Sequence, residues 1–212
     1  MKEVSVVLNG FRRPFSLEKQ YNAVKAQTVP AKEIFMWKNH PENETQFDFS
    51  KYTDLAISSN NANYGVWARF AFALNTTSEY ICVLDDDTIP SEKWFENCIH
   101  CIENENNGLY GTIGVIFNDL DYRSYIRHGW ANPNEETKEV DIVGHSWFFH
   151  RDLLGAFWRE STVPVSHLCG EDMHFSYAIQ KYLDLKTYVP PHPKDDKSLW
   201  GSDPELANRF GV

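Results

Sequence analysis

The sequence lacks any continuous apolar run of about 18 residues, the length that a helix needs to cross a bilayer. Its first apolar stretch, residues 4–8, is too short to form the core of a signal peptide. The chain also contains no internal repeat and no low-complexity segment. From these absences we expect a protein in the cytoplasm that has no membrane span.

Positive charge and cysteine are both scarce. The 20 Lys and Arg residues face 30 Asp and Glu residues, which gives a formal net charge of -10 and argues against a broad nucleic-acid surface. We therefore expect no nucleic-acid partner, and an anionic ligand would need a metal ion or local basic residues. The 4 cysteines include one C-x-x-C pair, Cys98 and Cys101, without the second pair that a zinc site requires.

What the chain has is enough apolar material for one substantial core. With 42% hydrophobic and 15% aromatic residues in 212, we expect a single domain over residues 1–212. Short apolar runs alternate with helical spacing, which predicts an α/β fold with a mostly parallel, Rossmann-like central sheet and helices on both faces. Strands are predicted near residues 4–8, 33–37, 55–58, 80–84, 109–117, 140–150 and 185–189, and helices near 17–24, 62–74, 91–105, 151–158 and 170–182. The long polar stretch 118–139 predicts a mobile loop or lid.

Three consecutive carboxylates, Asp85, Asp86 and Asp87, follow the apolar run 80–84. Carboxylates packed so closely repel one another unless a positive charge lies between them. Oxygen ligands of this kind suit Mg²⁺, Mn²⁺ or Ca²⁺. The simpler interpretation is an acidic turn in solvent at the end of a strand. The choice between a metal site and such a turn depends on residues elsewhere in the chain.

Polar and basic residues also follow the other predicted parallel strands. In open α/β sheets, ligands bind beyond the carboxyl ends of the strands. A nucleoside diphosphate bridged by a divalent metal would need basic and amide groups beside the carboxylates, although Arg12 and Arg13 alone could equally form a solvated loop. The candidates for nucleotide binding at this edge are Asn9, Arg12, Arg13, Lys38, Asn39 and Asn60, together with Asp85 and Asp86.

The order of these features resembles a GT-A glycosyltransferase. The resemblance rests on the Arg- and Asn-bearing turn after the first strand, residues 27–34, an Asn-rich turn before the helix that carries Arg69, and an apolar strand ending in Asp-x-Asp. Residues 35–39 and 83–88 are similar to the exostosin-like branch of those enzymes. A narrower resemblance is to viral multidomain glycosyltransferases, which implies the amino-terminal domain of a longer chain, further carboxyl-terminal domains and a location in the host cytoplasm.

The resemblance implies roles for the acidic residues. Asp85 would face the ribose or sugar and help to bind the metal, Asp87 would coordinate Mn²⁺ or Mg²⁺, and Asp86 could do either. Glu171 and Asp172, at the start of a late helix, would lie beside the reacting sugar carbon, with Asp172 as base or as a stabilising carboxylate. Acidic residues are also favoured in the first turn of any helix, which is the purely structural reading.

Further roles follow from the same resemblance. Arg69 would help to bind the nucleotide, and residues 144–149, with His145, are similar to the segment that lines the donor-sugar and acceptor pocket. His192 resembles a late histidine that adds a metal ligand, although a histidine among prolines is more often an exposed loop residue. Residues 1–90 would form the nucleotide-binding half and residues 91–212 the donor-sugar and acceptor half.

The expected activity is transfer of a hexose or deoxyhexose from a UDP-sugar donor to a hydroxyl of a glycan or glycoprotein acceptor. A phosphatase of the haloacid-dehalogenase type also has Asp-x-Asp after a strand, but it would have it near the chain start and Thr or Val where Ile89 stands. A metal-dependent nucleotidyltransferase is a closer alternative, although its Gly-rich basic opening loop is absent. A non-enzymatic Ca²⁺-binding module is the third, without the loop spacing of an EF-hand.

Overall fold

The computed structural model describes residues 2–40, 47–160 and 167–205. Within these ranges no helix combines the length and the apolar character needed to cross a membrane. The strands are β1 (Val4–Gly10), β2 (Ala31–Lys38), β3 (Leu55–Ser59), β4 (Tyr80–Leu84), β5 (Gly108–Tyr110), β6 (Ile113–Phe117), β7 (Tyr125–Gly129), β8 (Lys138–Val140), β9 (Ile142–Gly144), β10 (Ser146–His150) and β11 (Lys186–Val189). The helices are α1 (Leu17–Lys25), α2 (Ala68–Phe72), α3 (Trp94–Asn104), α4 (Leu154–Phe157) and α5 (Glu171–Leu183), with short 3-10 turns η1 (Ala73–Asn75), η2 (Arg151–Leu153) and η3 (Lys197–Leu199).

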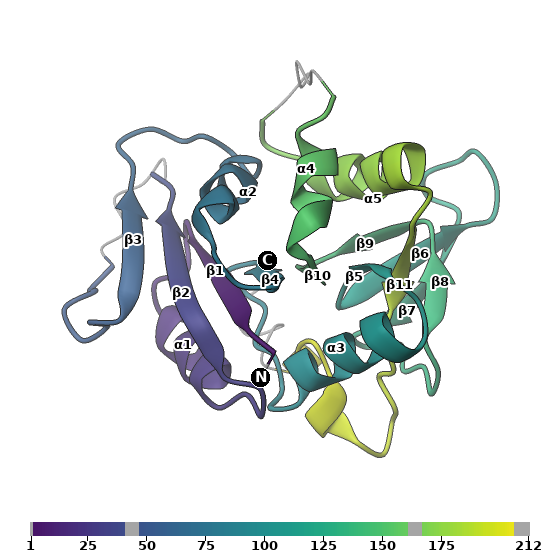
Figure 1. Ribbon diagram of the computed structural model, residues 1–212, viewed down its shortest axis with the longest axis horizontal. Helices are drawn as coiled ribbons and strands as arrows, with labels where there is room; N and C mark the ends of the chain where they lie inside the picture. The colour runs from purple at the N-terminus through teal and green to yellow at the C-terminus, as the bar shows by residue number, and fades with distance from the viewer. Residues whose placement is uncertain (1, 41–46, 161–166, 206–212) are drawn as a thin grey trace.

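An 8-stranded sheet forms the centre of the molecule, in the order β3-β2-β1-β4-β10-β5-β11-β8 (Figure 1). The first four of these strands are parallel to one another, and β11 is parallel to β5. Strand β10 runs antiparallel between β4 and β5, and β8 runs antiparallel at the far edge. The α/β fold with a mostly parallel sheet predicted from the sequence is therefore confirmed.

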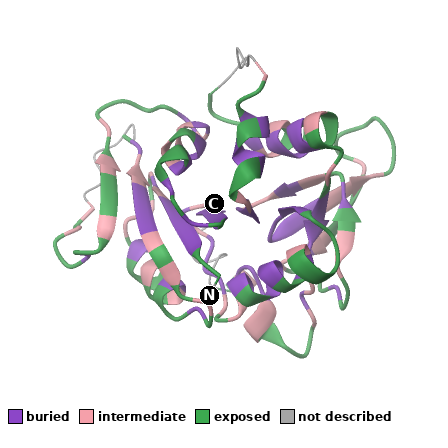
Figure 2. Ribbon diagram, in the orientation of Figure 1, coloured by how far each residue is buried: buried purple, intermediate pink, exposed green. Residues whose placement is uncertain are grey.

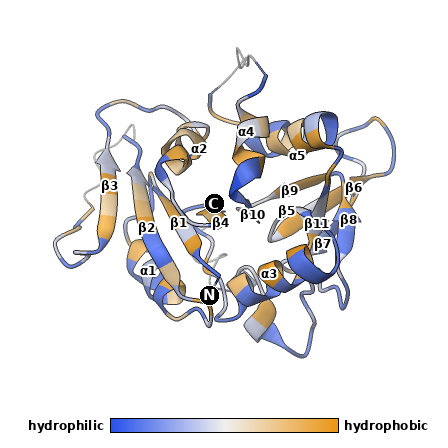
Figure 3. Cartoon of the chain, in the orientation of Figure 1, coloured by the Kyte–Doolittle hydropathy of each residue, from blue (hydrophilic) through white to orange (hydrophobic). Residues whose placement is uncertain are grey.

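The sheet is covered on both faces because successive strand residues point to opposite sides. Leu8 of β1 packs in a core cluster with α1 and α3, whereas its neighbour Val7 packs in a second cluster with α2, α4 and α5. Figure 2 shows buried residues along the central strands. Figure 3 shows hydrophobic residues on the same strands, and both hydrophobic and hydrophilic residues within α3. Each fully buried Val or Leu side chain contributes about 1.5–3 kcal/mol to stability. Both faces of the sheet are therefore stabilised by the helices that cover them.

Residues 118–139, predicted to be a mobile loop or lid, are not all loop, because they contain strand β7 and the first residues of β8. Strand β7 pairs antiparallel with β6, and β6 also pairs with β9, which makes a second sheet of 3 strands. Turn hydrogen bonds close the hairpin between β6 and β7, including those from Ser124 N to Asp121 O and from Asn118 N to Ser124 O. Three consecutive exposed residues of β7, Tyr125, Ile126 and Arg127, show no buried alternation, and this is why the strand was missed.

Two predicted long strands are each broken where the chain passes from the large sheet to the small one. Residues 109–117 divide into β5 in the large sheet and β6 in the small sheet, and residues 140–150 include β9 in the small sheet and β10 in the large sheet. The breaks face each other, because the hydroxyl groups of Thr112 and Ser146 share a buried hydrogen bond of 2.6 Å. This double break places the end of β9 and the start of β10 beside the end of β4.

Candidate active site

The parallel strands end level with one another, which gathers their following residues at one edge. Asn9 lies opposite Trp37, and Lys38 lies opposite both Gly10 and Ser59. On the other side of β1, Leu8 pairs with Leu84, the last residue before the three aspartates. The edge predicted as a ligand site therefore exists as one continuous rim, and the question is which side chains turn into it.

His145 is brought to the aspartates by the antiparallel pairing of β10 with β4. Ser146 lies opposite Leu84, and one residue further the Asp85 N–H donates to the His145 carbonyl at 3.1 Å. The Thr88 hydroxyl donates to the same oxygen at 2.7 Å. His145 has a φ of 63°, a left-handed conformation that is uncommon for a residue with a side chain and that accompanies the break between β9 and β10.

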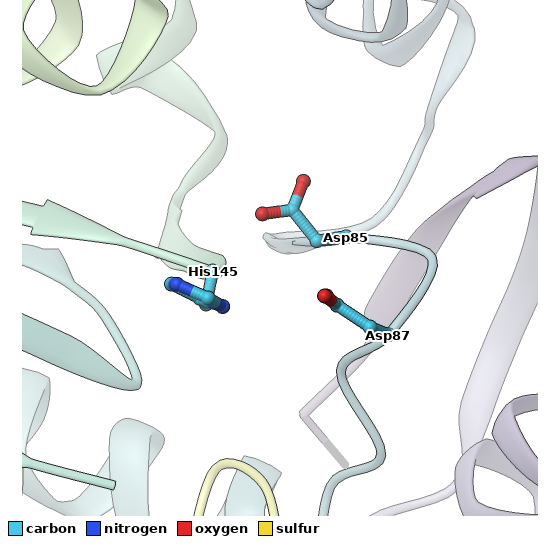
Figure 4. A group of neighbouring side chains, drawn as sticks. All are labelled: Asp85, Asp87 and His145. Carbon is cyan, nitrogen blue, oxygen red and sulfur yellow. The ribbon is translucent and has the colours of Figure 1, made fainter. Parts of the chain in front are cut away.

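Three side chains converge on one space at this edge. One ligand atom each from Asp85, Asp87 and His145 lies within 4.8 Å of the others, and Figure 4 shows the two carboxylates facing the imidazole. We call these three residues the metal group. Burial, followed by the nearby charge of Asp85, raises the pKa of Asp87. Two carboxylates and an imidazole are a donor set that fits Mn²⁺, and the carboxylates also suit Mg²⁺.

Asp86 is not part of the metal group. Its Oδ1 accepts a hydrogen bond from Arg13 at 2.5 Å, and its carbonyl accepts one from the Ser16 hydroxyl, also at 2.5 Å. Burial raises the pKa of Asp86, although Arg13 opposes this effect. The same Nη1 of Arg13 lies 3.8 Å from Asp87 Oδ2. Asp86 therefore holds Arg13 beside the metal group, where its positive charge can face an anionic ligand.

Arg69 is enclosed between the metal group and α5. Its side chain is only 1% exposed, one terminal amine contacts Asp85, and the other donates to Glu171 at 2.6 Å. The guanidinium also lies 4.7 Å from the ring centre of Trp147. The resemblance assigned Arg69 to nucleotide binding, and that role stays a prediction. What the structure shows is that Arg69 links the end of β4 to the start of α5.

Glu171 and Asp172 begin α5 after Gly170, whose φ of 92° favours glycine. Burial raises the pKa of Glu171 to about 7, although the positive charge of Arg69 acts to lower it. Asp172 is partly exposed, and its Oδ1 accepts from the Met173 N–H at 2.7 Å, which is the first-turn role open to any acidic residue. A Cβ added to Gly144 would lie 4.0 Å from Asp172 Oδ2, so the second oxygen faces the end of β9.

A hollow of about 250 Å³ opens between α5 and the small sheet. At ~30 Å³ for each water molecule it holds about eight, which is the scale of one monosaccharide ring. Sequence reasoning missed the side chains that the β6–β7 hairpin contributes, although Tyr125 and Arg127, two residues apart, share one face of a strand. The hollow is lined by Ile113, Val115, Phe117, Tyr122, Tyr125, Arg127, Ile142, Val143, Gly144, His145 and Asp172.

Comparison with known proteins agrees with this arrangement. Residues 5–161 match the model of Glycosyl transferase family 2. The chain belongs to that family. The predicted GT-A fold is thereby confirmed, whereas the narrower resemblances to the exostosin-like branch and to viral enzymes stay predictions. A comparison with curated protein sequences gave no match.

Solved structures resemble the chain at low identity. The structure titled GalNAc-T7 with UDP, GalNAc and Mn²⁺ matches at 14% identity and a TM-score of 0.68, over 90% of this chain and 42% of that one. TarS from S. aureus matches at 15% identity and a TM-score of 0.61, over 90% of this chain and 35% of that one. TarS 1–349 matches at 16% and 0.60, with 90% and 58% covered. These likenesses establish the fold, and the chain spans about a third to three-fifths of these relatives.

Other predicted residues of this family 2 domain shape the rim. The Asn39 amide is buried, donates to Asn63 Oδ1 at 2.8 Å and accepts from the Tyr64 N–H at 2.9 Å, so it fixes the turn before α2. Asn60 donates to the Lys38 carbonyl at 3.0 Å. Asn9 and Lys38 are partly buried at the ends of β1 and β2, and the Arg12 guanidinium lies 4.8 Å from the Phe11 ring centre.

His192 is not placed as a metal ligand. Its side chain is fully buried, its Nδ1 donates to the Pro190 carbonyl at 2.8 Å, and its Nε2 accepts from the Gly201 N–H at 3.1 Å. Its ring also packs against Trp94, with 5.5 Å between centres. Since both nitrogens are engaged, the imidazole has no lone pair left for an ion. Among the described residues, His145 provides the imidazole of the metal group instead.

Proposed function

We propose that this domain transfers a hexose or deoxyhexose from a UDP-sugar to a hydroxyl of a glycan or glycoprotein. One observation carries the proposal: His145 belongs both to the metal group and to the lining of the hollow that contains Asp172. A sugar in the hollow would therefore lie beside a metal-bound diphosphate and beside a carboxylate. Membership of Glycosyl transferase family 2 supports this reaction class.

Asp85, Asp87 and His145 would hold Mn²⁺ or Mg²⁺. Bound there, a divalent ion supplies Lewis-acid stabilisation of the negative charge on the departing nucleoside diphosphate. Arg13, held by Asp86 at 2.5 Å, adds a fixed positive charge at the same edge. The presence of UDP, GalNAc and Mn²⁺ in the GalNAc-T7 structure supports this choice of ligands. The remaining rim residues Asn9, Arg12, Lys38, Asn39 and Asn60 would surround the nucleotide.

Asp172 would act on the acceptor hydroxyl. In the proposed step the acceptor oxygen bonds to the sugar C1 while the bond from C1 to the phosphate oxygen breaks. The hydroxyl proton passes to Asp172, and the bonding electron pair leaves with UDP. Glu171 would act through Arg69, because their 2.6 Å contact fixes the first turn of α5 and hence the backbone of Asp172. Residues 1–90 would then supply the diphosphate site together with His145, and residues 91–212 the sugar sites.

Calorimetry with UDP tests the metal assignment. We expect wild-type protein to bind UDP at least about tenfold more tightly with Mn²⁺ than without it, because an ion held by the metal group would offset the negative charge of the diphosphate. Asp87→Ala should remove this difference, and Asp195→Ala, at an exposed acidic position, should retain it. Equal UDP affinity of wild type and Asp87→Ala in the presence of Mn²⁺ would refute the assignment.

Product analysis separates this function from the alternatives. A glycosyltransferase releases UDP from the donor, whereas a nucleotidyltransferase given a sugar phosphate and UTP releases pyrophosphate. A phosphoryl-transfer enzyme instead forms a phosphorylated acceptor or inorganic phosphate. A Ca²⁺-binding module would bind the ion with no response to UDP. Incubation with a panel of UDP-sugars and Mn²⁺, followed by chromatography of the nucleotides, distinguishes these outcomes.

A further inference from the structure

Arg127 is a cation in the hollow that has no carboxylate partner among the described residues. It lines the hollow from β7, and its Nη2 donates to the Tyr125 hydroxyl at 3.1 Å. Its guanidinium lies 5.6 Å from the ring centre of Tyr125. By contrast, Arg123 of the same hairpin pairs with Asp121 at 3.1 Å and does not line the hollow. Arg127 is exposed, so an anionic ligand that enters the hollow could reach its guanidinium.

The contacts of Arg127 with Tyr125 orient its guanidinium and leave its charge without a carboxylate partner among the described residues. Tyr125 accepts one hydrogen bond and offers an aromatic face, both of which orient a planar guanidinium. The guanidinium carries five N–H donors in a fixed fork, which matches carboxylate and phosphate oxygens better than any neutral group does. Arg127 is therefore oriented for an anion that the described protein does not supply.

The position of Arg127 separates that anion from the donor phosphates. The small sheet has the order β7-β6-β9, and the end of β9 carries Gly144 next to His145 of the metal group. Strand β7, with Arg127, is at the opposite edge of this sheet. The diphosphate of a nucleotide-sugar would be bound at the metal group. A second anion site across the sheet therefore suits the other substrate.

The remaining walls suit a sugar ring. Phe117, Tyr122 and Tyr125 line the same hollow, and aromatic faces pack against the apolar face of a sugar. Burial, followed by the charge of Asp172, raises the pKa of Tyr122, which places this phenol close to the proposed base. A ring held by these side chains would present its hydroxyl groups towards Asp172 and its acidic substituent towards Arg127.

We propose that the hollow is the acceptor subsite and that Arg127 selects acceptor sugars that carry an acidic group, a carboxylate or a phosphate. This inference rests on the proposed glycosyltransferase function and adds the chemical class of its acceptor. Arg127 is the specificity-determining residue, and the aromatic side chains and Asp172 act on the ring itself.

The test compares matched acceptors with UDP and Mn²⁺ present. The probes are methyl β-glucoside, methyl β-glucuronide and glucose 6-phosphate, with saturation-transfer NMR for binding and UDP-sugar turnover for transfer. We expect at least one acidic probe to be favoured over the neutral one by about tenfold or more, as for hydrogen bonds to charged groups. The carboxylate and phosphate probes identify which acid the site takes.

Variants assign the preference to Arg127. R127Q should abolish the preference and R127K should retain part of it, because lysine keeps the charge but loses the fork. R123Q, which removes the neighbouring paired arginine, should leave it intact. The inference is overturned if neutral and acidic probes behave alike, if none of the acidic probes binds, or if R127Q keeps the preference. A wild type that does not bind UDP with Mn²⁺ would instead refute the proposed function, so the two failures are distinguishable.

Discussion

Protonation of His192 should destabilise the domain as the pH falls. Burial lowers the pKa of His192 from an ordinary 6.5 to about 4. In its neutral form Nδ1 carries the proton that is donated to the Pro190 carbonyl, and Nε2 accepts from the Gly201 N–H. A second proton on Nε2 would face that N–H donor directly, so the charged ring loses a hydrogen bond as well as its hydration.

The magnitude follows from linkage between proton binding and folding. Above pH 6.5 the imidazole is neutral in both the folded and unfolded states, and its contribution is complete. Between 6.5 and the folded pKa of about 4 only the unfolded state binds the proton, so stability is lost as pH falls through this window. At about 1.4 kcal/mol per pH unit, the full loss is about 3.5 kcal/mol, of which about 2.5 kcal/mol is lost between about pH 7.5 and about pH 4.5.

Urea unfolding at these two pH values measures the effect. His192→Gln lowers stability at both, but its loss between them should be about 2.5 kcal/mol smaller than that of wild type, because glutamine does not titrate. His100→Gln, at an exposed position of α3, should show the wild-type loss. Mn²⁺-dependent UDP affinity should be the same in wild type and His192→Gln. Equal pH dependence of wild type and His192→Gln, together with weakened Mn²⁺-dependent UDP binding, would refute the reasoning and restore His192 as a ligand.

Two further substitutions test the link between the metal group and α5. Asp172→Asn should keep UDP affinity but lower turnover by about 10²–10⁴-fold, which is the range for loss of a general base. Undiminished turnover would show that Asp172 serves only to stabilise the first turn of α5. Arg69→Met should lower the free energy of unfolding in urea by about 3–5 kcal/mol, because Asp85 and Glu171 lose the cation that both contact. Wild-type stability in Arg69→Met would show that these carboxylates do not depend on the guanidinium.

Features that depend on neighbouring residues were predictable from the sequence. The apolar run 80–84 with aspartates after it determined that β4 would be buried and that Asp85 and Asp87 would emerge at its end. Alternation of strands and helices predicted the parallel half of the sheet, and so the rim that carries Asn9 and Lys38. The apolar pattern of a segment indicates whether that segment is buried. These elements were predictable because their own residues carry that pattern.

Features that depend on contacts between distant segments required the folded chain. His145 joins Asp85 and Asp87 only because β10 pairs antiparallel with β4, which no local pattern reveals. The same holds for Arg69, whose burial requires both β4 and α5, and for Arg127, whose strand is exposed and so lacks an apolar period. The apolar periodicity of a sequence indicates which residues of a segment are buried. Pairing between segments that are distant in the sequence decides which polar side chains come into contact.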